Sequence, residues 1–253
     1  MVKNIKDFEY RPGLYAKKKP SIAELTHRYI REWNEERQRR EKTSLTPGKL
    51  PPTICFSRII GVGAVEIADI LAKKIGYHVV ERQILEHITD EMKLMDMTTA
   101  SFDERYPGKM GEYLSRIFKE TAFPDNEYNR HLFATIFAVA GLGPTIFVGW
   151  GTHLVLPRER VLAVRMICSK EYRIRRLAMI FKENEDNIER KLEENDLTQR
   201  YFYKKVYHLE NASSHEFDLV INCDFIQDPK DAAAIVELAF KKKFDGEETG
   251  EIF

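Results

Sequence analysis

The sequence has few cysteines and no long apolar run. Its three cysteines, Cys55, Cys168 and Cys223, are scattered over 253 residues, and no CxxC or Cys/His spacing indicates a metal site. Each lies in or at the end of an expected strand, which is typical of buried, inert thiols in a reducing cytoplasm. No apolar segment approaches the roughly 20 residues of a membrane span, and residues 1–13 lack the apolar core of a signal peptide. We therefore expect a cytoplasmic protein with no membrane partner and no metal site.

The sequence also lacks net charge. Lysine and arginine together number 40, and so do aspartate and glutamate, so the formal net charge is zero. A balanced chain gives no sign of a polyanionic partner such as nucleic acid. Its length suffices for one sizeable α/β domain with an appendage.

The stretch from Thr53 to Ile75 carries the clearest functional signal. It reads as a short apolar strand at 53–56, a turn at 57–64 that contains Gly61 and Gly63, and then an amphipathic helix. A strand that breaks at closely spaced glycines and continues as a helix presents backbone N–H groups and the helix N-terminus to an anion. This pattern predicts a phosphate-binding loop.

Downstream, apolar runs alternate with amphipathic segments. The apolar runs are typical of strands buried on both faces, and they lie at 77–80, 145–149, 161–168 and 217–222. Helices are expected at 81–93, 132–140, 171–182, 186–207 and 229–240. Because strands alternating with helices imply a parallel sheet with right-handed crossovers, we expect a three-layer α/β fold.

Two segments interrupt this alternation. A highly charged helix is expected at 22–42, opening with a capping box at Ser21 and Glu24, and a Pro-rich linker follows at 46–52. We interpret this helix as a solvated arm, with docking of a second copy or a protein partner, or of nucleic acid, as alternatives. Residues 95–130 mix charged and aromatic residues with proline and glycine, which is typical of a helical insertion.

The motifs along residues 53–240 resemble the cytidylate kinase-like family, a branch of the P-loop nucleoside monophosphate kinases. The family opening, roughly I-S-R-x-x-G-S-G-G-R-E-I-A, overlays residues 56–68 without a gap. Further similar segments follow in the family's order. The family's Asp-Arg pair corresponds to Glu81-Arg82, and its V-G-R-G-A segment corresponds to residues 148–152, which read VGWGT. Residues 158–176 are similar to its strand and lid-entry helix, and FDLVIN at 217–222 resembles its Y-D-L-V-I-N strand. The resemblance implies a P-loop kinase fold with a helical insertion, a lid and an N-terminal helical arm.

Several positions depart from these patterns. A standard phosphate loop ends in Gly-Lys-Ser/Thr, whose lysine reaches the outer phosphates and whose hydroxyl holds Mg²⁺. Here Ala64 occupies the position of that lysine, and Glu66 lies near the position of the hydroxyl residue. Val62 replaces the family's loop serine, and Trp150 replaces the arginine of its G-R-G segment. Because phosphoryl transfer depends on positioning and on neutralising phosphate charge, each lost cation removes a transition-state contact.

The resemblance implies ATP and Mg²⁺ as cofactors and a set of site residues. The residues expected to bind ATP are Ser57, Arg58, Gly61, Val62, Gly63, Ala64 and Val65. Those expected to act in catalysis are Arg58, Arg173 and Arg176, and those expected to bind the acceptor are Arg82, Asp196 and Arg200. The alternatives are a solvated helix face for the arginines and a salt bridge from Arg82 to Glu81 or Glu86. Glu66 is interpreted either as an indirect Mg²⁺ ligand or as an acid that favours the helix dipole.

The expected domains are an N-terminal arm at 1–50, a kinase domain at 51–245 and a tail at 246–253. Within the kinase domain, an acceptor-binding insertion is expected at about 95–130 and a lid at about 182–212. The function implied by the resemblance is transfer of the ATP γ-phosphoryl group to a nucleoside monophosphate, with CMP or dCMP first. Two alternatives stay open: a catalytically degenerate nucleotide-binding or regulatory protein of the same fold, and a kinase of another small molecule.

Overall fold

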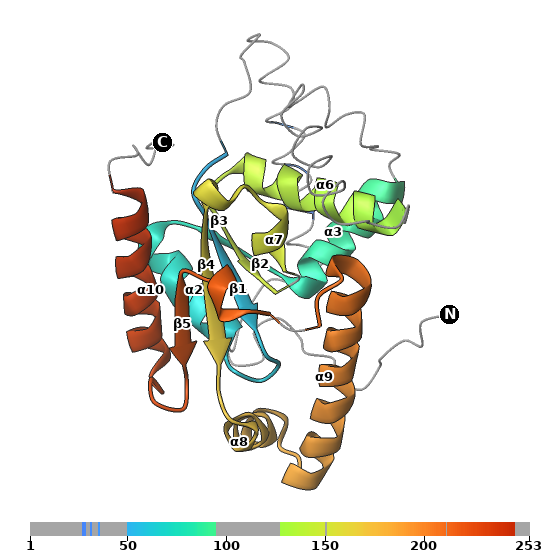
Figure 1. The fold of residues 1–253 in the computed structure, drawn as a ribbon, viewed down its shortest axis with the longest axis vertical. Helices are drawn as coiled ribbons and strands as arrows, with labels where there is room; N and C mark the ends of the chain where they lie inside the picture. The colour runs from blue at the N-terminus through green and yellow to red at the C-terminus, as the bar shows by residue number, and fades with distance from the viewer. Residues whose placement is uncertain are drawn as a thin grey trace.

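The computed structural model describes residues 27, 28, 31, 35, 50–94, 127–149, 151–210 and 212–245. The strands among them are β1 (Thr53–Arg58), β2 (His78–Glu81), β3 (Thr145–Val148), β4 (Val161–Ile167) and β5 (Leu219–Asn222) (Figure 1). The helices are α2 (Ala64–Ile75), α3 (Arg82–Leu94), α6 (Glu127–Leu142), α7 (Thr152–Val155), α8 (Lys170–Phe181), α9 (Glu185–Tyr207) and α10 (Pro229–Phe244), with 3-10 turns at Arg158–Arg160 and Ser214–Glu216. None of these helices combines the length and the hydrophobicity needed to cross a membrane.

The described strands form one parallel sheet in the order β2-β3-β1-β4-β5. The central strand is β1, in which Cys55 pairs with Phe147 of β3 and with Ala163 of β4. Residues 53–57 of β1 are buried without interruption, as expected for a strand that is covered on both faces. The prediction of a parallel α/β sheet is confirmed.

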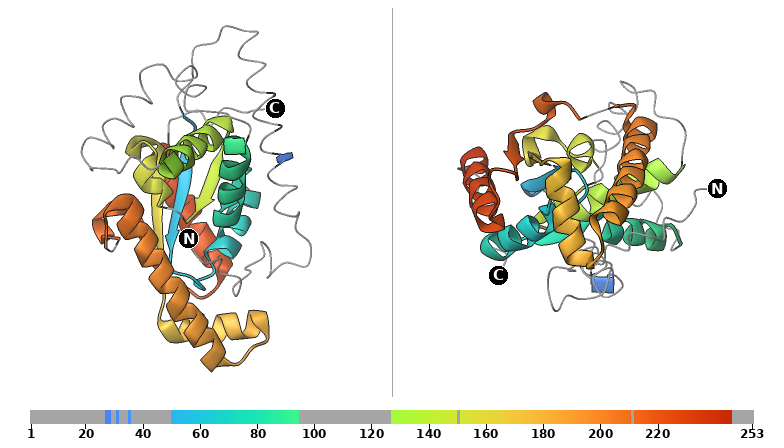
Figure 2. Two further views of the ribbon diagram at one scale, coloured as in Figure 1. Left: turned by 90° about the vertical axis from the view of Figure 1, so that its right-hand side faces the viewer. Right: turned by 90° about the horizontal axis from the view of Figure 1, so that it is seen from below.

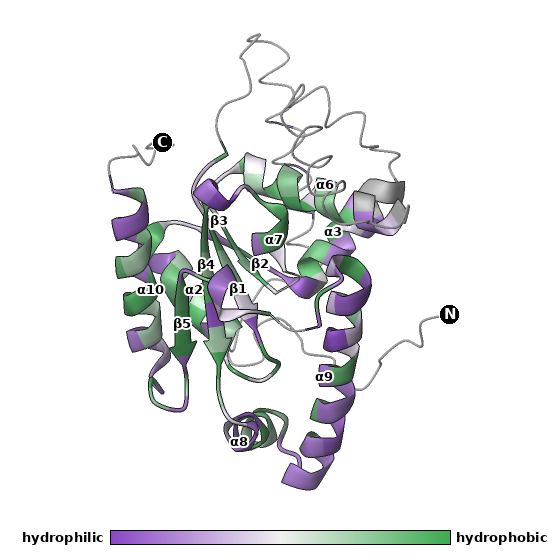
Figure 3. Cartoon of the chain, in the orientation of Figure 1, coloured by the Kyte–Doolittle hydropathy of each residue, from purple (hydrophilic) through white to green (hydrophobic). Residues whose placement is uncertain are grey.

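Helices cover both faces of the sheet. On one face, α2 and α10 pack over side chains that include Ile54, Val164 and Ile221, and Figure 2 shows these two helices next to each other. On the other face, α3, α6 and the end of α9 pack over Phe147 and Ala163. Hydrophobic residues gather on the strands, while α9 is hydrophilic along much of its length (Figure 3). The result is the expected three-layer arrangement.

Helix α8 and the start of α9 lie beyond the carboxyl ends of the strands, whereas the end of α9 runs beside the sheet (Figure 1). Helix α8 follows β4 directly, and Ser169 caps it by accepting a hydrogen bond on Oγ from the Tyr172 N–H at 3.2 Å. Asn184 caps α9 in the same way, through Asn187. The two helices share a small core that also contacts Ile60, in the loop after β1; this core contains Ile174, Leu177, Ile188 and Leu192. The loop is therefore packed against α8 and α9.

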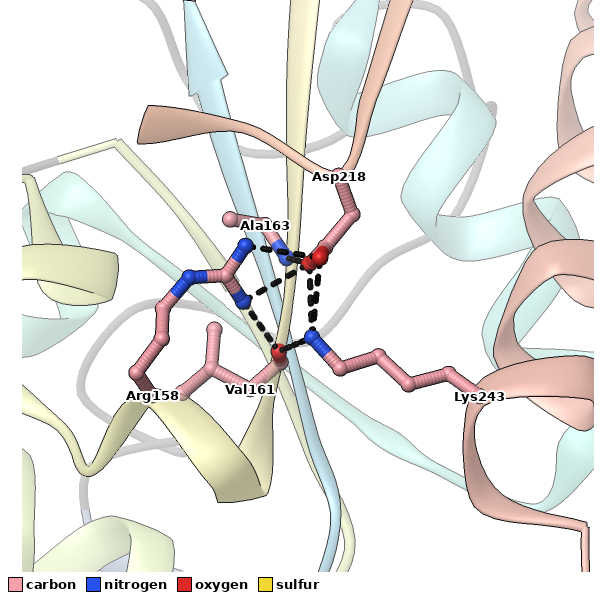
Figure 4. Close-up of polar contacts among 5 residues, drawn as sticks. All are labelled: Arg158, Val161, Ala163, Asp218 and Lys243. Atoms are coloured by element: carbon pink, nitrogen blue, oxygen red, sulfur yellow. Dashed lines mark hydrogen bonds and ion pairs between the residues drawn. The ribbon is translucent and has the colours of Figure 1, made fainter. Parts of the chain in front are cut away.

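Asp218 ties β4, β5 and α10 together at the start of β5 (Figure 4). Its carboxylate accepts hydrogen bonds from the Arg158 Nη atoms at 2.8 and 2.7 Å, from Lys243 Nζ at 2.9 Å and from the Ala163 N–H at 2.8 Å. Lys243 Nζ also donates to the Val161 carbonyl at 2.7 Å. Burial alone would raise the pKa of Asp218, but the hydrogen bonds from Arg158 and Lys243 outweigh it and lower the pKa.

Some expected boundaries shift, and some expected segments lie outside the described residues. Strand β5 begins at Leu219 rather than Phe217, because Phe217 is the C-terminal cap of a 3-10 turn that has a capping box between Ser213 and Glu216. Of the helix expected at 22–42, only residues 27, 28, 31 and 35 are described, and these are helical. Most of the insertion expected at 95–130 lies outside the described residues.

The cysteines are free thiols. Burial raises the pKa of Cys55 to about 12, that of Cys168 to about 12 and that of Cys223 to about 11. The prediction of buried thiols is confirmed for Cys55 and Cys223, whereas Cys168 is only partly buried.

Candidate functional site

The loop between β1 and α2 is shaped by two glycines. Gly61 and Gly63 adopt positive φ angles of +88° and +92°, a region that other residues enter only with strain. A Cβ on Gly61 would lie 2.9 Å from Leu177 Cδ1, and a Cβ on Gly63 would lie 3.2 Å from the Arg176 guanidinium. The glycines thus allow both the turn and the close approach of α8.

A cleft of about 210 Å³ opens beside this loop. It brings together arginines from three elements: Arg58 at the end of β1, Arg82 at the start of α3 and Arg176 on α8. Three carboxylates also line it, from Glu66, Glu81 and Glu86. The remaining lining residues are Ile60, Gly61, Gly63, Ala64, Val65, Leu177, Phe181 and Asn195. The cleft therefore combines a glycine loop and three arginines, which can bind an anionic ligand, with three carboxylates that balance the charge of the arginines.

Arg176 and Glu66 form an ion pair across the cleft. Arg176 Nη2 donates to Glu66 Oε2 at 2.8 Å, and the side chains are 18% and 31% exposed. Glu66 lies in the first turn of α2, where a carboxylate favours the helix dipole. The pair links α8 to the beginning of α2.

A second ion pair among the lining residues joins Arg82 to Glu86. Arg82 Nε donates to Glu86 Oε1 at 3.2 Å, one helical turn further along α3. Burial raises the pKa of Glu86, and the neighbouring Arg82 opposes that rise. The salt bridge named as an alternative for Arg82 is present, and Arg82 still lines the cleft.

Arg173 and Asp196 do not line the cleft but bind each other. Arg173 donates from Nη1 and Nη2 to the two Asp196 carboxylate oxygens at 2.9 and 2.8 Å, and from Nη1 to the Ile60 carbonyl at 3.3 Å. The Arg173 side chain is 9% exposed and that of Asp196 25%. In this arrangement the pair joins α8 to α9 and to the loop.

Of the other expected site residues, some line the cleft and others do not. Ala64 and Val65 line the cleft with Gly61 and Gly63, whereas Val62 points into the core under α2. Ser57 is buried and accepts a hydrogen bond on Oγ from Arg165 Nη1 at 2.7 Å. Arg200 is exposed on α9 and is not among the lining residues. Trp150 lies outside the described residues.

Six lining residues were not among the expected site residues: Ile60, Glu81, Glu86, Leu177, Phe181 and Asn195. The i,i+4 spacing of Arg82 and Glu86 is a local signal that points to their pairing. Phe181 and Asn195 come from the end of α8 and the middle of α9. Nothing in the local sequence around either one indicates that it faces the cleft.

The residues fit a phosphate ligand better than a dedicated metal site. Within the described ranges, no cluster of three or more His, Cys, Asp and Glu side chains is arranged to hold a metal ion. Mg²⁺ in phosphoryl-transfer sites is held by one or two carboxylates together with the phosphates of the ligand. Two carboxylates of the cleft are candidates for that contribution. Glu66 lies just after the glycine loop, and Glu81 is the last residue of β2.

A glycine loop between a central parallel strand and a helix, with arginines converging on it, defines a P-loop kinase-like α/β protein. The model of the cytidylate kinase-like family matches residues 53–224, and the chain belongs to that family. No curated protein matches the sequence.

One solved structure shares the fold at low sequence identity. An uncharacterized protein from Eubacterium ventriosum ATCC 27560 is 15% identical over 77% of this chain and 99% of its own, with a TM-score of 0.58. Two weaker likenesses have TM-scores of 0.35 and 0.33. They are a shikimate kinase from Bacteroides thetaiotaomicron (14% identical, 76% of this chain, 96% of its own) and a dephospho-CoA kinase from Campylobacter jejuni (12%, 76%, 99%). The first supports the fold, and the two weaker likenesses say nothing of a substrate.

Proposed function

We propose that this chain is a phosphotransferase that moves the γ-phosphoryl group of ATP to a nucleoside monophosphate, with CMP or dCMP as the first candidates. The observation that carries the proposal is the convergence of Arg58, Arg82 and Arg176 on one cleft beside the glycine loop. Phosphoryl transfer needs mainly positioning and neutralisation of phosphate charge, and membership of the cytidylate kinase-like family supports the same chemistry.

The position of each arginine suggests its role. Arg58 and Arg176 flank the loop and would neutralise the phosphates of the donor, while backbone N–H groups of the loop bind them. Arg82 lies at the start of α3 and would grip the acceptor phosphate through two N–H groups. Residues 182–212, which include α9, would act as the lid, and α8 would lead into it; the two helices share a core that contacts Ile60 of the loop. When bound, Mg²⁺-ATP would supply the transferable group.

Turnover assays test this proposal directly. Purified protein is incubated with Mg²⁺-ATP and each common nucleoside monophosphate, and diphosphate formation is followed by chromatography. We expect turnover with at least one monophosphate and a tenfold or larger rise in the acceptor KM for Arg82→Ala, since removing a charge-assisted contact costs about 1.5 kcal/mol or more. Arg175→Ala is the matched control, because Arg175 is exposed on α8 and outside the cleft. Turnover no greater than background with every acceptor would contradict the proposal.

The loop itself favours a second candidate, a nucleotide-binding or regulatory protein that has lost catalysis. Ala64 is buried at the position of the usual lysine, and the nearby Arg176 is already paired with Glu66. Saturable ATP binding without turnover of any acceptor would favour this candidate.

A kinase of another small molecule is favoured by the acceptor end of the cleft. The carboxylates of Glu81 and Glu86 stand there beside Arg82, and carboxylates accept hydrogen bonds from hydroxyl or amino groups. Turnover of a hydroxylated metabolite, with none of any monophosphate, would favour this candidate.

The surroundings of the kinase domain are also proposals. We propose that the domain spans residues 51–245, with an acceptor-binding insertion at about 95–130, and that it works in the cytoplasm without a nucleic-acid or membrane partner. Residues 1–50 would form an arm that docks a second copy or a protein partner. Light scattering of the full chain and of a chain that begins at residue 51 tests this role of the arm. If the arm docks a second copy, the molar mass should fall by more than the mass of the deleted residues.

A further inference from the structure

Arg176 occupies a special place at the glycine loop. A Cβ on Gly63 would lie 3.2 Å from both Nε and Cζ of Arg176 and 3.3 Å from its Nη2, so the guanidinium lies directly against this glycine. Gly63 is also the N-terminal cap of α2, and it offers no side chain to the first N–H groups of that helix. An anion bound at these N–H groups would therefore lie beside the Arg176 guanidinium.

Glu66 holds the guanidinium in this place. Within the described part of the chain, the Arg176 side chain makes one hydrogen bond, the 2.8 Å bond to Glu66. A guanidinium has five N–H donors, so the bond to Glu66 fixes its orientation and leaves donors for a ligand. The side chain is only 18% exposed, and a long side chain fixed in advance loses less entropy when it binds.

The position of Glu66 in the sequence matters here. The loop has Ala64 where a standard phosphate loop has its lysine, and Ala64 is 1% exposed, so the loop offers no cation of its own at that position. Two residues later, Glu66 reaches from α2 to α8 and brings in a cation from a different element. Arg176, on the other side of the cleft, thus supplies a cation beside the loop, which has none at residue 64.

We propose that Glu66 is a positioning residue that holds Arg176 over the loop, so that Arg176 replaces the missing loop lysine in binding a phosphate chain. This rests on the proposed function only in its ligand class, a linear polyphosphate. A carboxylate so close to an anionic ligand repels it electrostatically, so a net gain from Glu66 requires that the orientation of Arg176 outweighs this repulsion. If Glu66 instead competes with the ligand for Arg176, its removal strengthens binding.

The experiment compares the full chain with three variants by calorimetric titration of inorganic tripolyphosphate. We expect Glu66→Ala to weaken binding about tenfold, in line with the loss of one charge-assisted contact. Glu66→Gln keeps an oxygen that accepts the Arg176 hydrogen bond without the charge, so it should restore binding to the wild-type level or better. Glu171→Ala, which removes an exposed carboxylate from α8, is the control and should leave the affinity unchanged. Unfolding midpoints of all variants are measured alongside to show that each is folded.

Each outcome separates this inference from the proposed function. Tripolyphosphate binding that follows the expected order, without nucleotide turnover, supports the role of Glu66 and contradicts the kinase. Turnover that is lost in Arg176→Ala but unchanged in Glu66→Ala supports the kinase and overturns the role of Glu66. Equal or tighter tripolyphosphate binding by Glu66→Ala also overturns it. A wild-type chain that binds neither tripolyphosphate nor ATP overturns both.

Discussion

At the scale of single residues, the glycine loop depends on the space at Gly61. Gly61 and Gly76 both adopt positive φ, at +88° and +70°, but only Gly61 has close neighbours. A Cβ there would lie 2.9 Å from Leu177 Cδ1 and 3.2 Å from Arg173 Cβ, whereas a Cβ on Gly76 would meet nothing within 4 Å. The same substitution at the two glycines therefore separates backbone strain from packing.

We expect Gly76→Ala to cost about 1 kcal/mol, the cost of the backbone conformation alone. Gly61→Ala should cost clearly more, because its new methyl group also pushes against α8. Urea unfolding of both variants measures the difference. Equal losses would mean that the loop is not packed against α8 as described.

Asp69 is a second residue with a testable property, since burial raises its pKa from 3.8 to about 6 despite the opposing charge of Lys73. A raised carboxyl pKa means that the folded state binds this proton more tightly than the unfolded state does. The resulting stabilisation is complete below the unfolded pKa and is lost as the pH rises through about 6. We expect Asp69→Asn to raise the free energy of unfolding by about 1 kcal/mol at pH 7, a value discounted for partial solvent exposure. At pH 3.5 the substitution should change the stability little.

Thermal unfolding of wild type and variant at both pH values checks this. If the gain in stability over wild type is no larger at pH 7 than at pH 3.5, the prediction is wrong.

At the scale of helices, the Arg173–Asp196 pair fixes α8 to α9. Removing one partner leaves the other charge buried and unpaired, so we expect Arg173→Leu to cost about 3 kcal/mol. Asp196→Asn should cost less, because the amide that replaces the carboxylate keeps an oxygen that accepts a hydrogen bond from Arg173. The double variant should lose less than the sum of the two, since the residues are coupled. Urea unfolding provides these three values.

The control for this pair is Lys191–Glu183, a partly exposed ion pair at 3.0 Å that joins the turn between α8 and α9 to α9. Lys191→Ala should cost only about 0.5 kcal/mol, as is usual for exposed pairs. If Arg173→Leu costs no more than Lys191→Ala, the buried pair does not fix the two helices.

The elements were easier to predict than the contacts between them. Buried parallel strands are continuous apolar runs, and the strand, glycine turn and helix at residues 53–75 form a local pattern, so both are visible in the sequence. Arg173 and Arg176 share a helix face, and both were expected to reach a phosphate. The structure separates them, because Asp196 on α9 engages Arg173 while only Arg176 enters the cleft. Which of the two arginines faces the cleft depends on how α8 packs against α9, and the spacing of residues within α8 does not predict that packing.

At the scale of the whole molecule, Asp218 secures the edge of the sheet to α10. Its lowered pKa means that the ionised carboxylate stabilises the folded state above the unfolded pKa, and that this contribution disappears as the pH falls through the lower folded pKa. Asp218→Asn should therefore destabilise the protein by about 1 to 2 kcal/mol at pH 7, a range that allows for partial exposure, and by less at pH 3. Melting curves at the two pH values test this. An equal loss at both would show that the charge of Asp218 does not matter.

The arrangement of the whole molecule places a cation-lined cleft where the loop after β1, the start of α3 and helix α8 meet. We expect this cleft to bind a nucleotide by its phosphates, with Arg176 as a principal contact. Calorimetric titration of Mg²⁺-ATP into wild type, Arg176→Ala and Arg175→Ala is the most direct test. We predict similar affinities for wild type and Arg175→Ala and a loss of about tenfold or more for Arg176→Ala. Absence of ATP binding by the wild type, or equal binding by Arg176→Ala, would contradict a phosphate site in this cleft.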